Sequence, residues 1–142
     1  MRKLTFTFFI LMLLLIACGN GDGGESEEQK EEPTPTPATA GDAAKGKELF
    51  RQTTIGSRAG CVTCHSLEPD TVLVGPSLAG IGDRAASRVS GKSAADYLRE
   101  SLLDPGAHTV EGYAAGLMPA ALADEMTDQQ VEDLVAYLLT LK

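Results

Sequence analysis

The chain has 142 residues, which is enough for one small domain. Its three cysteines are too few for a disulfide framework. Its net charge is −8, and residues 41–142, with fourteen acidic and nine basic side chains, contribute −5. This acidic balance excludes nucleic-acid binding, because phosphates require a basic face.

Residues 1–17 are predicted to be a signal peptide. Arg2 and Lys3 precede an apolar run from Leu4 to Ile16, which is too short to cross about 30 Å of hydrocarbon comfortably. The run ends in Leu15-Ile16-Ala17-Cys18, which resembles a bacterial lipobox and implies that Cys18 is lipidated and begins the mature protein. An ordinary secretory signal or an uncleaved anchor is the alternative. All three interpretations place the domain outside the cytoplasm, and lipidation anchors it to the cell membrane.

Residues 18–40 are predicted to form a disordered tether behind the lipidated cysteine. After several glycines they contain an acidic run at 25–32 and a proline-rich run at 33–37, with almost no apolar side chains. Such a segment cannot bury enough surface to offset its ordering entropy. Order against a neighbouring subunit is the alternative.

The domain, residues 41–142, is predicted to be helical, with no alternating pattern typical of strands. The first helix runs from about Ala43 to Gln52 and is capped by Asp42. Its packing positions are Gly46, Leu49 and Phe50.

Cys61-Val62-Thr63-Cys64-His65 is the most informative motif, because CxxCH is the attachment pattern of a c-type haem. Each thiol forms a thioether with one vinyl group, and the histidine is the proximal iron ligand. A redox disulfide belongs in a βαβ context, which is absent here. A zinc site that adds His108 remains the other alternative, although the adjacent Cys64 and His65 would crowd a tetrahedral ion.

Two further helices follow this motif. The middle helix starts after Ser93, stops before Pro105 and turns inward Tyr97, Leu98, Leu102 and Leu103. The last helix starts with a capping box of Thr127 and Gln130, preceded by a hydrophobic staple residue, Met126. Its apolar stripe is Val131, Leu134, Val135, Leu138 and Leu141.

The second iron ligand is predicted to be Met118. It lies in the loop Gly116-Leu117-Met118-Pro119, whose proline fixes the backbone beside the sulfur. Met126 already has its role as a staple, and His108, in a Pro-Gly turn, is the alternative ligand. A thioether opposite histidine raises the reduction potential relative to two histidines and leaves no open iron site.

This layout resembles the class I monohaem cytochrome c family over residues 41–142. The resemblance implies an all-α fold of three main helices plus short helical turns around one covalent haem c. In that family the first and last helices cross, and Gly46, Phe50 and Tyr137 match the contact positions.

The resemblance also implies roles for residues around the haem. The Pro76 carbonyl accepts the hydrogen bond from the free ring nitrogen of His65. Arg84 and Tyr113 are partners for the haem propionates. The apolar wall comes from Leu78, Ile81, Leu98 and Leu102.

The predicted function is that of a membrane-tethered one-electron carrier, not an enzyme. Residues 97–119 resemble cytochrome c domains of terminal oxidases and monohaem lipoprotein subunits of quinol-oxidising complexes. The implied donor is a quinol-oxidising complex, and the implied acceptor is a terminal oxidase or a photosynthetic reaction centre. A haem-based gas sensor or a small haem enzyme, each with a displaceable sixth ligand, is the alternative.

Overall fold

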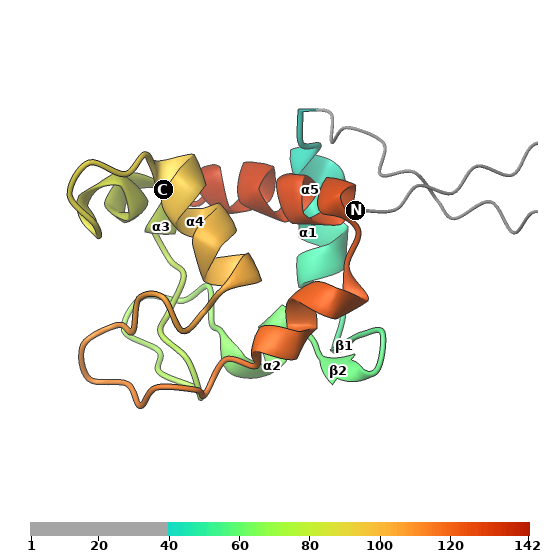
Figure 1. Cartoon of the computed structure of the whole chain (residues 1–142), viewed down its shortest axis with the longest axis horizontal. Coiled ribbons are helices and arrows are strands. Elements are labelled where there is room, and N and C mark those ends of the chain that lie inside the picture. Colours follow the sequence, from blue (N-terminus) through green and yellow to red (C-terminus); the bar gives the residue numbers. More distant parts are fainter. Residues whose placement is uncertain (1–39) are drawn as a thin grey trace, which may run out of the picture. The chain divides into compact units, whose positions relative to one another are not determined.

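Helices make up nearly all the regular structure in the computed structural model, which describes residues 40–142 (Figure 1). The predicted signal peptide, Cys18 and all of the predicted tether except its last residue lie outside the described part. The elements in order are α1 (Ala43–Phe50), β1 (Thr54–Ile55), β2 (Arg58–Ala59), α2 (Cys61–Cys64), α3 (Ile81–Arg84), η1 (Ala85–Ser87), α4 (Ala94–Leu103), η2 (Ala120–Glu125) and α5 (Asp128–Leu139). The predicted all-α class, with three main helices and short helical turns, is confirmed. Over residues 40–142, no helix is long and apolar enough to cross a membrane.

The first helix begins as predicted and ends two residues early. The Asp42 side chain accepts hydrogen bonds from the backbone N–H groups of Ala44 and Lys45, at 2.9 and 3.3 Å. The helix ends at Phe50, because the N–H of Gln52 bonds to the Leu49 carbonyl in a turn.

An antiparallel hairpin that the sequence did not predict follows α1. Its register pairs Thr54 with Ala59 and Ile55 with Arg58. Each strand has two residues, and only Ile55 is buried. Such strands are too short to produce an alternating pattern.

The last helix, α5, starts with the predicted capping box. The N–H of Gln130 donates to the Thr127 hydroxyl at 3.2 Å, and the Gln130 side chain accepts from the Thr127 N–H at 2.8 Å. These bonds satisfy amide groups that a helix start leaves unpaired. Met126, the predicted staple, is partly buried against the core.

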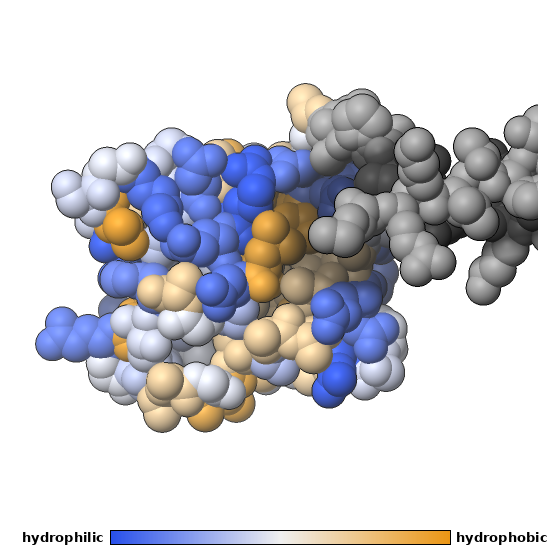
Figure 2. All heavy atoms as spheres, in the orientation of Figure 1, coloured by the Kyte–Doolittle hydropathy of each residue, from blue (hydrophilic) through white to orange (hydrophobic). Residues whose placement is uncertain are grey.

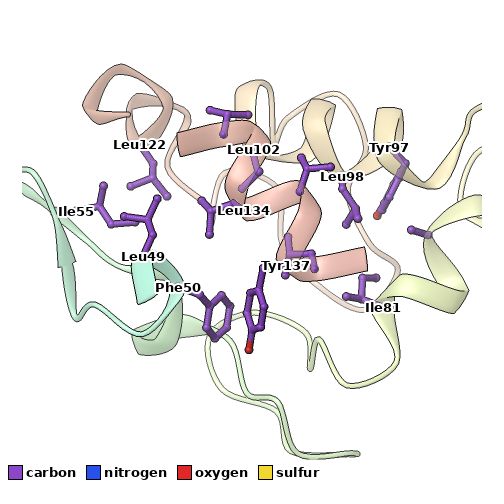
Figure 3. Packing of buried hydrophobic residues seen from close by; sticks show 14 residues of the cluster. Leu49, Phe50, Ile55, Ile81, Tyr97, Leu98, Leu102, Leu122, Leu134 and Tyr137 are labelled. Atoms are coloured by element: carbon purple, nitrogen blue, oxygen red, sulfur yellow. The ribbon is translucent and has the colours of Figure 1, made fainter. Parts of the chain in front are cut away.

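The α1 and α5 helices cross in close contact at Gly46 (Figure 1). A Cβ atom at this position would lie 1.9 Å from the Asp133 carbonyl oxygen, so only glycine allows this approach. The Asp133 side chain is 4% exposed and accepts the Asp42 N–H at 2.7 Å. Beside the crossing, the Phe50 and Tyr137 rings pack at 5.5 Å and 56° (Figure 3).

The middle helix, α4, packs against α5 and is tied to it by an ion pair. Arg99 donates from Nε and Nη2 to both carboxylate oxygens of Glu132, at 2.6 and 2.7 Å. The predicted cap is present, since Ser93 accepts from the Asp96 N–H at 3.1 Å. Leu103, predicted to face inward, is instead 47% exposed, because it lies one position further around the helix than buried Leu102.

The core lies between α1, α4, α5 and η2 (Figure 3). It contains nearly all the apolar positions predicted on the three main helices. Leu141 is partly buried at its edge. The buried members are Leu49, Phe50, Ile55, Ile81, Ala85, Tyr97, Leu98, Leu102, Leu122, Val131, Leu134, Val135, Tyr137 and Leu138.

Candidate functional site

The CxxCH motif forms a single helical turn, α2, with both thiols free. The His65 N–H donates to the Cys61 carbonyl at 2.9 Å, and the Thr63 hydroxyl donates to the Gly60 carbonyl at 2.6 Å. The Gly60 N–H donates to the Thr53 carbonyl at 2.8 Å, which connects the turn to the residue just before the hairpin. These local bonds place both cysteines and the histidine in one short, fixed segment.

The His65 ring is oriented by the turn that contains Pro76. Its Nδ1 lies 2.8 Å from the Pro76 carbonyl oxygen. A carbonyl can only accept, so Nδ1 carries the proton and Nε2 keeps a lone pair for a metal. A Cβ at Gly75 would lie 2.5 Å from His65 Cε1, so the ring lies directly against the glycine backbone.

Two backbone hydrogen bonds connect the loop around Pro76 to the end of the CxxCH turn. The Gly75 N–H donates to the Cys64 carbonyl, and the Leu78 N–H donates to the Ser66 carbonyl, each at 2.8 Å. The hydrogen bond to His65 therefore depends on backbone contacts as well as on the proline itself.

An open cleft lies against α2. It contains all the predicted site residues of the described part except Arg84: Cys61, Cys64, His65, Pro76, Leu78, Tyr113 and Met118. Ile81, Leu98 and Leu102, predicted as apolar wall, line it too. The cleft has the concave, mostly apolar character typical of cofactor sites.

Of the three candidates for the second iron ligand, two line the cleft and one does not. Met118 lines the cleft and is partly buried against the core, whereas Met126 does not line it. Gly112 and Gly116 turn the preceding loop with φ of 87° and 78°. His108 also lines the cleft, with its ring edge-on to Tyr97 at 5.8 Å between centroids.

Comparison with known proteins identifies the family. Residues 43–142 match the family model described as Cytochrome c. A cytochrome c2 of Rhodopseudomonas palustris is 33% identical over 126 residues, which covers 71% of this chain and 99% of the relative. This chain belongs to the cytochrome c family. A cytochrome c2 of R. palustris strain ATCC BAA-98 / CGA009 is 34% identical (74% and 84% covered), and cytochrome c2 iso-2 of Rhodospirillum centenum is 30% identical (69% and 93%).

The chain is therefore a class I c-type cytochrome, and its family binds covalent haem c. The residues of the cleft fit that group. Two unpaired thiols share one turn, an imidazole nitrogen is free in the same cleft, and a thioether, Met118, lines it as well. The haem supplies a one-electron iron couple. The chain holds the group, orients the imidazole and surrounds it with apolar side chains.

The alternatives to haem fit the described residues poorly. Cys61 and Cys64 form no disulfide, and residues 40–142 contain no cluster of three or more His, Cys, Asp or Glu side chains suited to a metal ion. Burial raises the pKa of the Cys61 thiol from 9.0 to about 11.

The arginine at the cleft differs from the one that the sequence indicated. Arg84 lies outside the cleft lining, and its guanidinium donates to the carbonyls of Ala79 and Ser77, the latter at 3.3 Å. Arg88 lines the cleft instead, and its Nε is buried without a hydrogen-bond partner among the described residues. Sequence reasoning missed Arg88; the signal available was a second arginine one helical turn beyond Arg84.

Members of this family are haem-based electron carriers that act with redox partners and are not enzymes. The apolar lining of the cleft is consistent with that role. It limits the water that must reorganise when the charge on the iron changes.

Proposed function

We propose that this cytochrome is anchored by lipid on Cys18 to the outer side of the cell membrane. There it carries single electrons from a quinol-oxidising complex to a terminal oxidase or a photosynthetic reaction centre. The observation that carries the proposal is that His65 and Met118 line the same cleft, next to the two free thiols.

The two proposed axial ligands determine the chemistry. If the His65 nitrogen and the Met118 sulfur both bound the haem iron, no position would remain for a substrate, and the haem would supply one-electron transfer alone. The hydrogen bond from His65 Nδ1 to the Pro76 carbonyl orients the imidazole. A gas sensor or a small haem enzyme is the alternative function, and it requires Met118 to leave the iron easily.

The surface supports a protein partner near the haem. Three consecutive apolar side chains, Val72, Leu73 and Val74, are each at least 47% exposed, and Leu117, next to the proposed ligand, is 48% exposed. Figure 2 shows apolar and pale residues over the part of this face where η2 and the loop before it run. Because residues 41–142 carry a net charge of −5, the proposed partner has a basic docking face.

The membrane anchor is supported by the sequence alone, through the lipobox-like segment that ends at Cys18 and the glycine- and proline-rich residues behind it. Replacing Cys18 with serine should release the haem protein from membranes into the soluble fraction, or leave the leader uncut. Mass spectrometry of the mature N-terminus separates these results. A mature protein that starts elsewhere and carries no acyl chain would contradict the anchor but not the carrier function.

Ligation is tested by Met118→Ala, with Met126→Leu as the matched control outside the cleft. The ferric wild-type protein should show the weak far-red absorption band typical of a methionine–iron bond. Met118→Ala should lose this band, bind CO in the ferrous state and shift to a lower potential. Met126→Leu should keep the wild-type spectrum. An unchanged spectrum in Met118→Ala, or CO binding by the wild-type protein, would rule out the proposed ligand set.

A further inference from the structure

The last residue of η2, Glu125, places its carboxylate in the turn of the β1–β2 hairpin. Its Oε1 accepts a hydrogen bond from the Ser57 hydroxyl, 68 residues earlier in the chain. Its Oε2 lies so close to Gly56 that a Cβ there would be 1.9 Å away, and Gly56 has a φ of 54°. The Arg58 Nε lies 3.9 Å from Oε1 and adds a longer ion pair. Three consecutive hairpin residues therefore surround one carboxylate.

The two segments that Glu125 joins lead to the two halves of the haem site. The hairpin continues through Gly60 directly into α2, the turn that carries both thiols. At its other end, η2 starts straight after Pro119, which follows Met118. Figure 1 shows η2 beside the hairpin. The contact at Glu125 therefore limits how far the methionine loop can move from the cysteine turn.

The loop before η2 has few hydrogen bonds to the rest of the domain. In the described structure, the N–H groups of residues 105–119 donate backbone hydrogen bonds only to carbonyls of residues 104–119, as Tyr113 does to Val110 at 3.1 Å. The position of the loop therefore depends strongly on the helix that follows it. That helix is held by buried Leu122 in the core and by Glu125 at its end.

We propose that Glu125 is a positioning residue for the axial methionine, because its contact with the hairpin keeps η2, and with it Met118, in place at the haem iron. Glu125 does not itself line the cleft and acts through η2. This inference rests on the proposed ligation by Met118. Without the contact, the loop leaves the iron more often, and the sulfur is exchanged more easily for another ligand.

The contact depends on pH, because a charged carboxylate accepts hydrogen bonds more strongly than a neutral one. Hydrogen bonds from the Ser57 hydroxyl and N–H lower the pKa of Glu125 from its usual 4.5; burial opposes this shift, and the charge of Arg58 on the hairpin adds to it. The stabilisation is therefore fully present above pH 4.5 and is lost as the pH falls through the lowered pKa. Asp124, the exposed neighbour of Glu125 on η2, is a second carboxylate on the same helix.

The test measures how tightly free imidazole binds to the ferric holoproteins, at about pH 8 to keep the probe neutral. Imidazole reaches the iron only where Met118 has left, so its affinity reports the fraction of open molecules. Glu125→Ala and Ser57→Ala should each bind it several-fold more tightly than the wild type, and the double variant should add little to either. Asp124→Asn, which loses the same charge one residue away, should match the wild type. Unchanged imidazole affinity in Glu125→Ala, even with lower global stability, would overturn the inference.

A second measurement uses the conservative variant Glu125→Gln, which keeps the shape of the side chain and removes its charge. The far-red band should disappear at a lower urea concentration in Glu125→Gln than in the wild type at pH 7, and this difference should shrink as the pH is lowered below 4.5. No difference at pH 7, or a difference independent of pH, would count against the inference. Failure of the ligation itself gives another result: the wild-type ferric protein would lack the far-red band, and Met118→Ala would bind imidazole as the wild type does.

Discussion

Replacing Gly46 with alanine tests how tightly α1 and α5 must approach to hold the domain together. The added Cβ would lie 1.9 Å from the Asp133 carbonyl oxygen and 2.5 Å from its carbonyl carbon, whereas ordinary contacts begin at 3.4 Å. These are backbone atoms of a buried helix, so no side-chain rotation relieves the clash. The helices must separate by about 1.5 Å, the difference between 3.4 and 1.9 Å.

The expected loss in the free energy of unfolding follows from the contacts that this separation strains. Overpacking costs about 1–3 kcal/mol. Loss of the 2.7 Å hydrogen bond from the Asp42 N–H to the buried Asp133 carboxylate would add about 1.5–3 kcal/mol to this destabilisation. Loss of the Phe50–Tyr137 ring contact would add about 0.5–1.5 kcal/mol. The higher helix propensity of alanine offsets about 1 kcal/mol of this loss. The expected net loss is at least about 2 kcal/mol, or a fall in Tm of at least about 8 °C for a domain of this size.

The assay is thermal and urea unfolding of the holoprotein, followed by far-UV circular dichroism. Gly106→Ala is the matched control, because its added Cβ would meet only the Asp104 carboxylate, at 3.4 Å. It should stay within about 0.5 kcal/mol of the wild type. If Gly46→Ala were equally harmless, or stabilising, the tight crossing of α1 and α5 would be refuted.

Three more outcomes follow from the site and its support. Gly75→Ala places a Cβ 2.5 Å from His65 Cε1, so it should turn the imidazole and shift the Soret band and the potential; an unchanged spectrum would contradict the contact. Replacing both α2 cysteines with serine should abolish covalent haem and, with it, most helical circular dichroism, because core residues line the cleft. The hydrogen bond from Arg99 lowers the pKa of Glu132 from its usual 4.5. The ion pair therefore stabilises the fold fully at pH values above 4.5, and this stabilisation is lost as the pH falls through the lowered pKa of Glu132. Glu132→Gln should therefore be less stable than the wild type at pH 7, and the difference should shrink as the pH is lowered below 4.5, as unfolding over a pH series would show.

Helix starts were predictable from the sequence because they depend on local chemistry. Asp42, Ser93 and Thr127 each cap the helix that follows, as their residue types and neighbours indicate. Helix ends were less predictable: α1 stops at Phe50, where a turn leads into a hairpin that only four residues define. What the cap residues do not encode is the tertiary contact that decides where a helix stops.

The positions of Arg84 and Arg88 relative to the cleft could not be predicted from the sequence, and the proposed role of Arg84 at a propionate stays a prediction. The two side chains are four residues apart, and helical spacing alone would place them on one face. Between them the chain changes from α3 to the 3-10 helix η1, and the hydrogen bonds to Ala79 and Ser77 hold Arg84 outside the cleft. A change of helix type within one turn leaves no clear mark on the sequence, so only the structure distinguishes the two arginines.

The two halves of the proposed iron site depend on different levels of structure. The CxxCH turn and its bond to Pro76 are held by contacts within residues 53–78, most of them between backbone atoms. Met118 lies in a loop between α4 and η2; η2 packs on α4, α4 packs on α5, and α1 in turn supports α5. Weakening the crossing at Gly46 should therefore release the methionine–iron bond at a lower urea concentration, while the thioethers and the His65 bond persist. In Gly46→Ala the far-red band should disappear before the helical signal; simultaneous loss of both would mean that the loop and the helices unfold as one unit.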